Sequence, residues 1–168
     1  MSLYNTIKSF KGISIYDFLK YAIIVTTLVT LYVKFIPNNF IKDQEKTLST
    51  YDLIKLYANR FVHIFLGIIA TGYPFLVEYT IFMDIIYILY SIGLIILWHW
   101  NSECVLSVHE KQILDPCYKK GENIYYQPYV VLLSRSKTPL QKSHPLTTPY
   151  ILLFYVTART IYNILHKK

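Results

Sequence analysis

The stretch from Ile81 to Trp100 reads IFMDIIYILYSIGLIILWHW, and it decides the fold class of this chain. It carries a single charged side chain, Asp84, close to its start. Twenty helical residues extend about 30 Å, which matches the thickness of the hydrocarbon core of a bilayer. The stretch therefore predicts a helix that crosses a membrane, with Asp84 near enough to one end to reach the interface.

Three further apolar stretches accompany it, at residues 15–36, 61–77 and 146–165. Hydrophobic residues make up 54% of the chain and charged residues only 16%, whereas soluble domains average about 25% charged residues. The four stretches predict an all-α membrane protein, with one membrane domain of 168 residues built as a bundle of about four transmembrane helices. The last stretch is the weakest because Arg159 interrupts it, and its alternative is a helix that lies flat in the interface.

The second and third stretches are separated by only a few residues, centred on Glu78 and Tyr79. This short connection predicts a tight helical hairpin. Gly67, Ala70 and Gly72 in the second stretch are small enough to let a neighbouring helix approach closely.

The connector before the second stretch, residues 38–60, contains a signal for the start of a helix. Its segment Ser49-Thr50-Tyr51-Asp52 has the residue types that cap a helix N-terminus. Two readings follow: a short amphipathic helix on the membrane surface, or an extension of the second apolar helix toward its N-terminus.

The net charge of +7 is carried by basic residues at the ends of the predicted spans. With four spans, both termini and the hairpin turn share one side of the membrane. That side has five basic residues, and the opposite side has ten, in residues 38–60 and 101–145. The larger number favours the cytoplasm for the second side. The basic residues suit anionic lipid, and no nucleic-acid-binding motif is present, so we expect the bilayer as a partner and no nucleic acid.

Residues 101–145 form the one large extramembrane loop that the sequence predicts. They contain Cys104 and Cys117, which are thirteen residues apart and match no zinc or thioredoxin-type spacing. A disulfide between them and two free thiols are both open, and a cytoplasmic loop would favour the free thiols.

Ser107 and Glu110 in this loop have the spacing of a capping box. In that motif the Ser hydroxyl accepts from the amide of the Glu, and the Glu carboxylate accepts from the amide of the Ser. The pattern predicts a short helix that begins at Ser107 and stops before Asp115-Pro116. It gives Ser107 and Glu110 a structural role rather than a catalytic one.

The same segment carries a resemblance. His63 at the start of one span, followed by Cys104-Val105-Leu106-Ser107 and Glu110, resembles a family of small multi-pass membrane proteins of unknown function. That family has Cys-Pro-Leu-Thr followed shortly by Glu, so this chain departs from it at Val105 and Ser107. Residues 101–129 are also similar to uncharacterised membrane proteins of large DNA viruses, which would imply a host endomembrane or a virion membrane. Neither resemblance implies an activity.

His63 and His99 give the sharpest chemical hypothesis. They lie at the two ends of the hairpin remote from its turn, so we expect them at the same membrane face, where a pair of histidines can bind haem or a metal ion. Histidines that simply sit at the interface are the plainer alternative. A lipid-modifying enzyme is a further alternative, with Cys104 as nucleophile and His99 or His109 as base.

No cofactor motif is present, and a non-enzymatic role fits the remaining features best. A compact membrane bundle with one basic loop suits a membrane organiser, an assembly factor or a component of a virion membrane. The expected partners are other membrane proteins or further copies of the chain.

Overall fold

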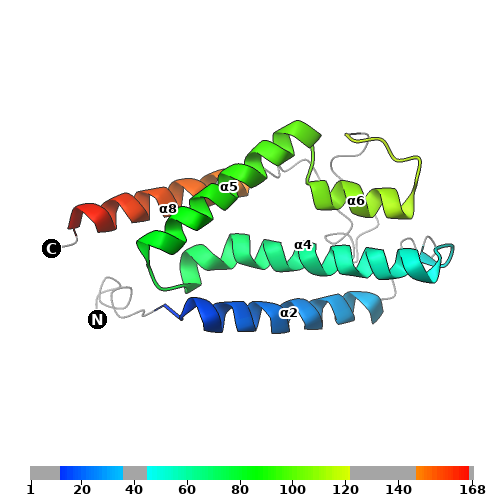
Figure 1. The fold of residues 1–168 in the computed structure, drawn as a ribbon, viewed down its shortest axis with the longest axis horizontal. Helices are drawn as coiled ribbons and strands as arrows, with labels where there is room; N and C mark the ends of the chain where they lie inside the picture. Colours follow the sequence, from blue (N-terminus) through cyan, green and yellow to red (C-terminus); the bar gives the residue numbers. More distant parts are fainter. Residues whose placement is uncertain (1–11, 36–44, 122–146, 167–168) are drawn as a thin grey trace.

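The computed structural model describes residues 12–35, 45–121 and 147–166, and within them the regular structure is helical apart from one isolated bridge. The helices are α2 (Ile15–Phe35), α4 (Thr50–Leu76), α5 (Ile81–Asn101), α6 (Val105–Leu114) and α8 (Thr147–His166) (Figure 1). The all-α prediction is confirmed. The second half of the predicted loop, from residue 122, lies outside the described residues.

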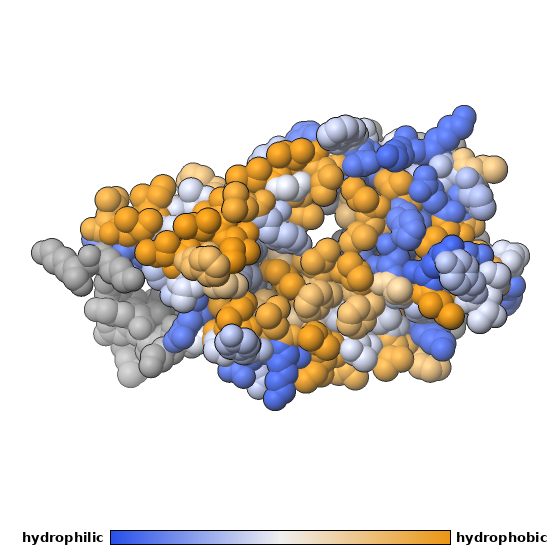
Figure 2. Space-filling view, in the orientation of Figure 1, coloured by the Kyte–Doolittle hydropathy of each residue, from blue (hydrophilic) through white to orange (hydrophobic). Residues whose placement is uncertain are grey.

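Three helices, α2, α4 and α5, are long and apolar enough to cross a membrane. Their outer faces carry large apolar side chains, for example Leu28 on α2 and Phe82 and Leu89 on α5, each more than half exposed. Figure 2 shows apolar residues over most of the visible face, whereas hydrophilic residues gather at the end where α6 lies. Exposed apolar surface on this scale is unfavourable in water, so the chain is an integral membrane protein.

The helix α4 begins earlier than the predicted second span. It starts at Thr50 rather than at residue 61, and it continues without a break to Leu76. Ser49 is its N-cap: the Ser49 hydroxyl accepts from the backbone amide of Asp52 at 3.1 Å and donates to the Asp52 carboxylate at 2.7 Å. No helix breaker follows before Pro74, so the extension, and not a separate surface helix, is correct.

The helix α2 packs along α4 in the opposite direction (Figure 1). Gly72 allows this approach, since a Cβ there would lie only 3.0 Å from the ring of Phe18. Among the described residues, no atom of another helix lies within 4 Å of a Cβ placed at Gly67, so the close approach that they show occurs at Gly72. Just before α2, Ile13 pairs with the hairpin turn: its amide donates to the carbonyl of Leu76 at 2.8 Å.

The hairpin connection is short, as predicted, but α4 and α5 diverge from it (Figure 1). Tyrosines bridge the two helices near the turn, where the rings of Tyr73 and Tyr87 stack with centroids 4.8 Å apart. Pro74 has no amide hydrogen, so it leaves the carbonyl of Ala70 without its usual donor within the helix. The hydroxyl of Tyr87 donates to that carbonyl at 2.5 Å. A side chain from α5 thus stabilises the proline-containing end of α4.

Polar contacts near both ends of α5 hold the helix α8 against it. Near the hairpin turn, buried Asp84 of α5 accepts from the guanidinium of Arg159, from Tyr73 at 2.6 Å and from Thr160 at 2.8 Å. At the other end, Tyr150 of α8 and His99 of α5 are hydrogen bonded at 2.8 Å. The two helices are therefore antiparallel. Although α8 is less apolar than the other three, its one charged side chain is paired; that it spans the bilayer stays a prediction.

We expect Arg159→Gln to lower the free energy of unfolding by about 3–5 kcal/mol, because it leaves Asp84 buried without its counterion. The measurement is denaturant unfolding in detergent micelles, followed by tryptophan fluorescence. The control is Lys55→Ala, which removes an exposed pair with Asp52 and should leave the unfolding curve nearly unchanged. Equal stability of Arg159→Gln and the parent protein would show that the pair does not hold α8.

Candidate functional site

Many of the buried polar and charged side chains lie where α6 packs on the first half of α4. We call residues 45–63 and 101–121 the polar cap. At the end of α5, Ser102 adopts a left-handed backbone with φ of 60°, which turns the chain back toward α4. The helix α6 then begins at Val105 and lies along α4 (Figure 1). Sequence elements about fifty residues apart therefore face each other across this contact.

The predicted capping box at Ser107 and Glu110 is wrong. The N-cap of α6 is Cys104, and Ser107 lies inside the helix. The buried Ser107 hydroxyl has no hydrogen-bond partner among the described residues. The Glu110 carboxylate is engaged with Arg60 of α4 instead. A charge-assisted hydrogen bond between buried ions is stronger than the bond of a carboxylate to a neutral amide, so the tertiary contact takes precedence over the local motif.

Arg60 and Glu110 form the centre of the polar cap. The guanidinium of Arg60 donates from Nε to Glu110 at 2.6 Å and from Nη1 to Glu45 at 2.6 Å, and the side chains of Arg60 and Glu110 are both 0% exposed. Burial raises the pKa of the Glu110 carboxyl, whereas the adjacent guanidinium opposes that rise. The pair of Arg60 with Glu110 joins α6 to α4, and the contact of Arg60 with Glu45 holds the segment before α4 against α4.

A second buried network, centred on Glu103, joins the start of α6 to the segment that follows α6. One Glu103 oxygen accepts from Lys111 at 2.5 Å. The other accepts from the Tyr118 hydroxyl at 2.6 Å and from the Gly121 amide at 3.0 Å. Gly121 has φ of 80°, a left-handed backbone that glycine adopts without strain. This network folds the segment after α6 back against the start of α6.

Two histidines and a cysteine complete the contact between α4 and α6. Asn59 donates to the carbonyl of Leu106 at 2.9 Å, and its side-chain oxygen is 3.0 Å from His109 Nδ1. His63 Nε2 is 3.5 Å from Cys104 Sγ. The thiol–imidazole contact is therefore made by His63, rather than by His99 or His109.

The structure gives His63 and His99 different partners. His63 contacts Cys104, whereas His99 contacts Tyr150 on α8. Within residues 12–35, 45–121 and 147–166, no group of three or more His, Cys, Asp or Glu side chains is placed to hold a metal ion. The haem or metal hypothesis therefore stays a prediction. Cys104 and Cys117 are both free thiols, and Cys117 is exposed.

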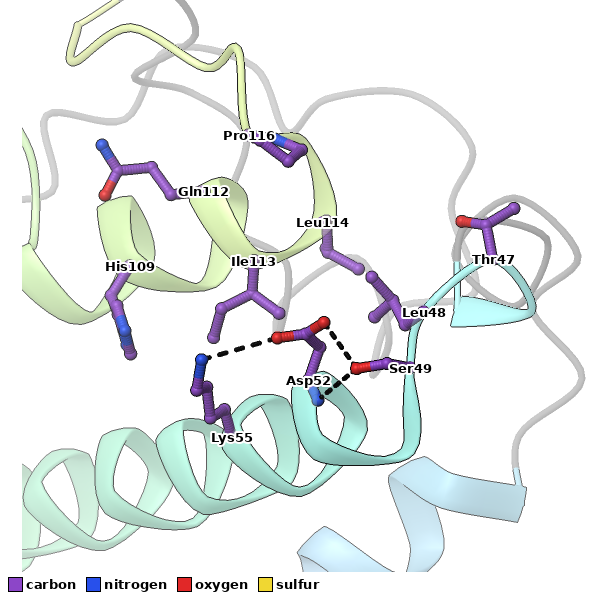
Figure 3. A pocket seen from close by; sticks show the side chains of 10 residues that line it. All are labelled: Thr47, Leu48, Ser49, Asp52, Lys55, His109, Gln112, Ile113, Leu114 and Pro116. Carbon is purple, nitrogen blue, oxygen red and sulfur yellow. Dashed lines mark hydrogen bonds and ion pairs between the residues drawn. The ribbon is translucent and has the colours of Figure 1, made fainter.

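A groove opens between α6 and the first turns of α4, with a volume of about 510 Å³ (Figure 3). In Figure 3, Ile113 and Leu114 point from α6 toward the start of α4, and Asp52 and Lys55 face them from α4. Gln112 of α6 also lines the groove. It thus combines an apolar floor with a polar and partly basic rim.

Sequence reasoning missed Asn59, Arg60, Glu103 and Lys111 as parts of this site. A weak signal existed in the spacing. Arg60 and His63 are three residues apart on α4, and Cys104, Ser107 and Glu110 are three apart along α6, so each set shares one helix face.

Comparison with known proteins gives no match: no family model, no curated protein and no solved structure is similar to this chain. The residues of the polar cap therefore carry the functional argument.

We expect Arg60→Met and Glu110→Met each to lower the free energy of unfolding by about 3–5 kcal/mol, since each leaves a buried charge without its partner. The double variant should be more stable than either single variant, because it removes both charges. Denaturant unfolding of all four proteins in detergent measures this cycle. Additive losses would show that the two side chains do not interact.

We expect Ser107→Ala to leave stability unchanged or to raise it slightly, because the alanine removes a buried hydroxyl that has no partner among the described residues. Ser107→Asp should be strongly destabilising, since it buries a charge. Thermal unfolding of the two variants distinguishes this from a capping role. In a capping role, alanine would cost about 1 kcal/mol and aspartate would be tolerated.

Proposed function

We propose that this chain is a non-enzymatic membrane organiser, which binds another membrane-associated protein through its polar cap. The observation that carries the proposal is how four buried charged side chains of the cap are used. Arg60, Glu110, Glu103 and Lys111 are each at most 4% exposed, and they pair with one another. These four side chains are engaged in holding α4, α6 and the segment after α6 together, which favours a structural use of the cap.

The groove of the cap is the proposed contact for the partner. Its floor of Ile113 and Leu114 offers an apolar contact, and its rim carries His109 and the ion pair of Lys55 with Asp52. An apolar floor beside polar and charged side chains favours a partner segment in which an apolar side chain stands next to polar ones. The net charge of +7 on the chain favours an acidic partner segment.

Site-specific photo-crosslinking tests this function in membranes from cells in which the protein naturally occurs. A photoreactive residue at Gln112, in the groove, should give one defined protein adduct. The same residue at Leu28, which is 61% exposed on the outer face of α2, should give lipid adducts. Lys55→Gln should reduce the adduct at Gln112 several-fold without changing thermal stability.

Two results would overturn the proposal. Adducts with lipid alone at Gln112 would show that the groove faces the bilayer. A product of twice the mass of the chain would show that the occupant is a second copy and not a different protein.

A further inference from the structure

The contact between Cys104 and His63 is a part of the cap that ion pairing does not explain. The thiol Sγ is 3.5 Å from His63 Nε2, and Cys104 is half-buried, so the sulfur is held beside a base and is still reachable. A nucleophile and a base within hydrogen-bond reach form the arrangement that activates cysteines in covalent chemistry.

The position of Cys104 in the fold adds to this arrangement. It is the N-cap of α6, a helix of ten residues. Negative charge that develops on the sulfur during attack lies at the N-terminus of that helix, where the helix dipole stabilises it. One turn further along α6, the buried Ser107 hydroxyl has no partner within the described part of the chain. The Ser107 hydroxyl is thus not committed to the fold.

The surroundings of Cys104 indicate what kind of reagent it meets. Leu97 and Trp100 of α5, seven and four residues before it, are exposed, with Trp100 at 83%, and Val105 immediately after it is also exposed. Tryptophan favours the membrane–water interface, so the thiol lies at the depth where lipid chains and polar head groups meet. A reagent that carries a long acyl chain would be concentrated there.

We propose that Cys104 is a self-acylation site, which takes a long-chain acyl group from an acyl thioester such as a fatty acyl-CoA. His63 takes the proton of the Cys104 thiol as the sulfur attacks the carbonyl carbon of the donor. The new carbon–sulfur bond forms on Cys104, and the bond from the carbonyl to the sulfur of the donor breaks. His63 returns the proton to the departing thiolate. The products are an acylated Cys104 and the free thiol of the donor, with no change in oxidation state.

This inference goes beyond the organiser function, because it concerns a covalent modification of the cap and not its partner. The acyl chain would enter the bilayer beside α5 and hold the cap against the membrane surface. The distribution of basic residues predicts that the cap faces the cytoplasm, which keeps its thiols reduced and able to react.

Purified full-length protein in phosphatidylcholine vesicles, with alkyne-tagged palmitoyl-CoA and no other protein, tests the proposal. Peptide mapping of the unsubstituted protein should place the label on Cys104, released by hydroxylamine, and far less on Cys117. Cys117 is the matched control, because it is exposed and has no histidine contact among the described residues. Cys117→Ser should keep the label, and Cys104→Ser should lose it.

The role of His63 has its own readout. His63→Gln should slow labelling at pH 7 by roughly a hundredfold, the scale of a general base, and the deficit should shrink at pH 9, where hydroxide can take the proton of the thiol in place of the imidazole. His99→Gln is the matched control at the same interface and should label at the parent rate. Equal labelling of the two cysteines, no labelling of the parent protein, or a parent rate for His63→Gln would each overturn the proposal. The comparison of the two cysteines needs no variant, so a folding defect in one variant leaves the test intact.

Discussion

Arg60 projects from a helix that is otherwise apolar enough to cross a membrane, and Glu110 meets it from a helix fifty residues later in the chain. Neither side chain is exposed. An ion buried without a counterion costs several kcal/mol, so α6 can satisfy both charges only by lying along α4. That one placement brings Cys104 opposite His63, and it forms the groove beside the first turns of α4.

The same constraint acts near the hairpin turn, through Asp84 and Arg159. Lipid tails are as apolar as leucine, so the hydrophobic effect does not drive helices together within a bilayer. Hydrogen bonds and close packing must do this instead, and the chain uses both. Asp84 gathers donors from α4 and α8, whereas Gly72 lets α2 approach closely through Phe18. Arg60 with Glu110 and Asp84 with Arg159 are therefore the ion pairs that hold helices of the bundle together.

The limits of helices that depend on local composition can be predicted from the sequence. The hydrogen-bond partners of side chains cannot be predicted where the partner is distant in the chain. The limits of residues 15–36 and 81–100 follow from length and hydropathy alone, and α2 and α5 match them closely. The capping box failed because Glu110 bonds to a residue that no local pattern reveals. For the same reason, the sequence places Arg60 among the basic residues of the connector and does not indicate its buried partner. The three-residue spacing shows which residues share a face of α4 and which share a face of α6. It does not show that these two faces are in contact, which only the fold determines.

The contacts of the two histidines depend on the course of the hairpin arms. Equal distance along the two arms of a hairpin places His63 and His99 at similar depth, provided that the arms remain parallel. In this protein α4 and α5 diverge, and the chain that follows α5 packs against α4 (Figure 1). Each histidine therefore contacts whatever lies beside its own helix: Cys104 for His63, and Tyr150 for His99. Divergence of the hairpin thus places an imidazole of α4 beside a thiol from the chain that follows α5, while a ligand shared by His63 and His99 stays a prediction.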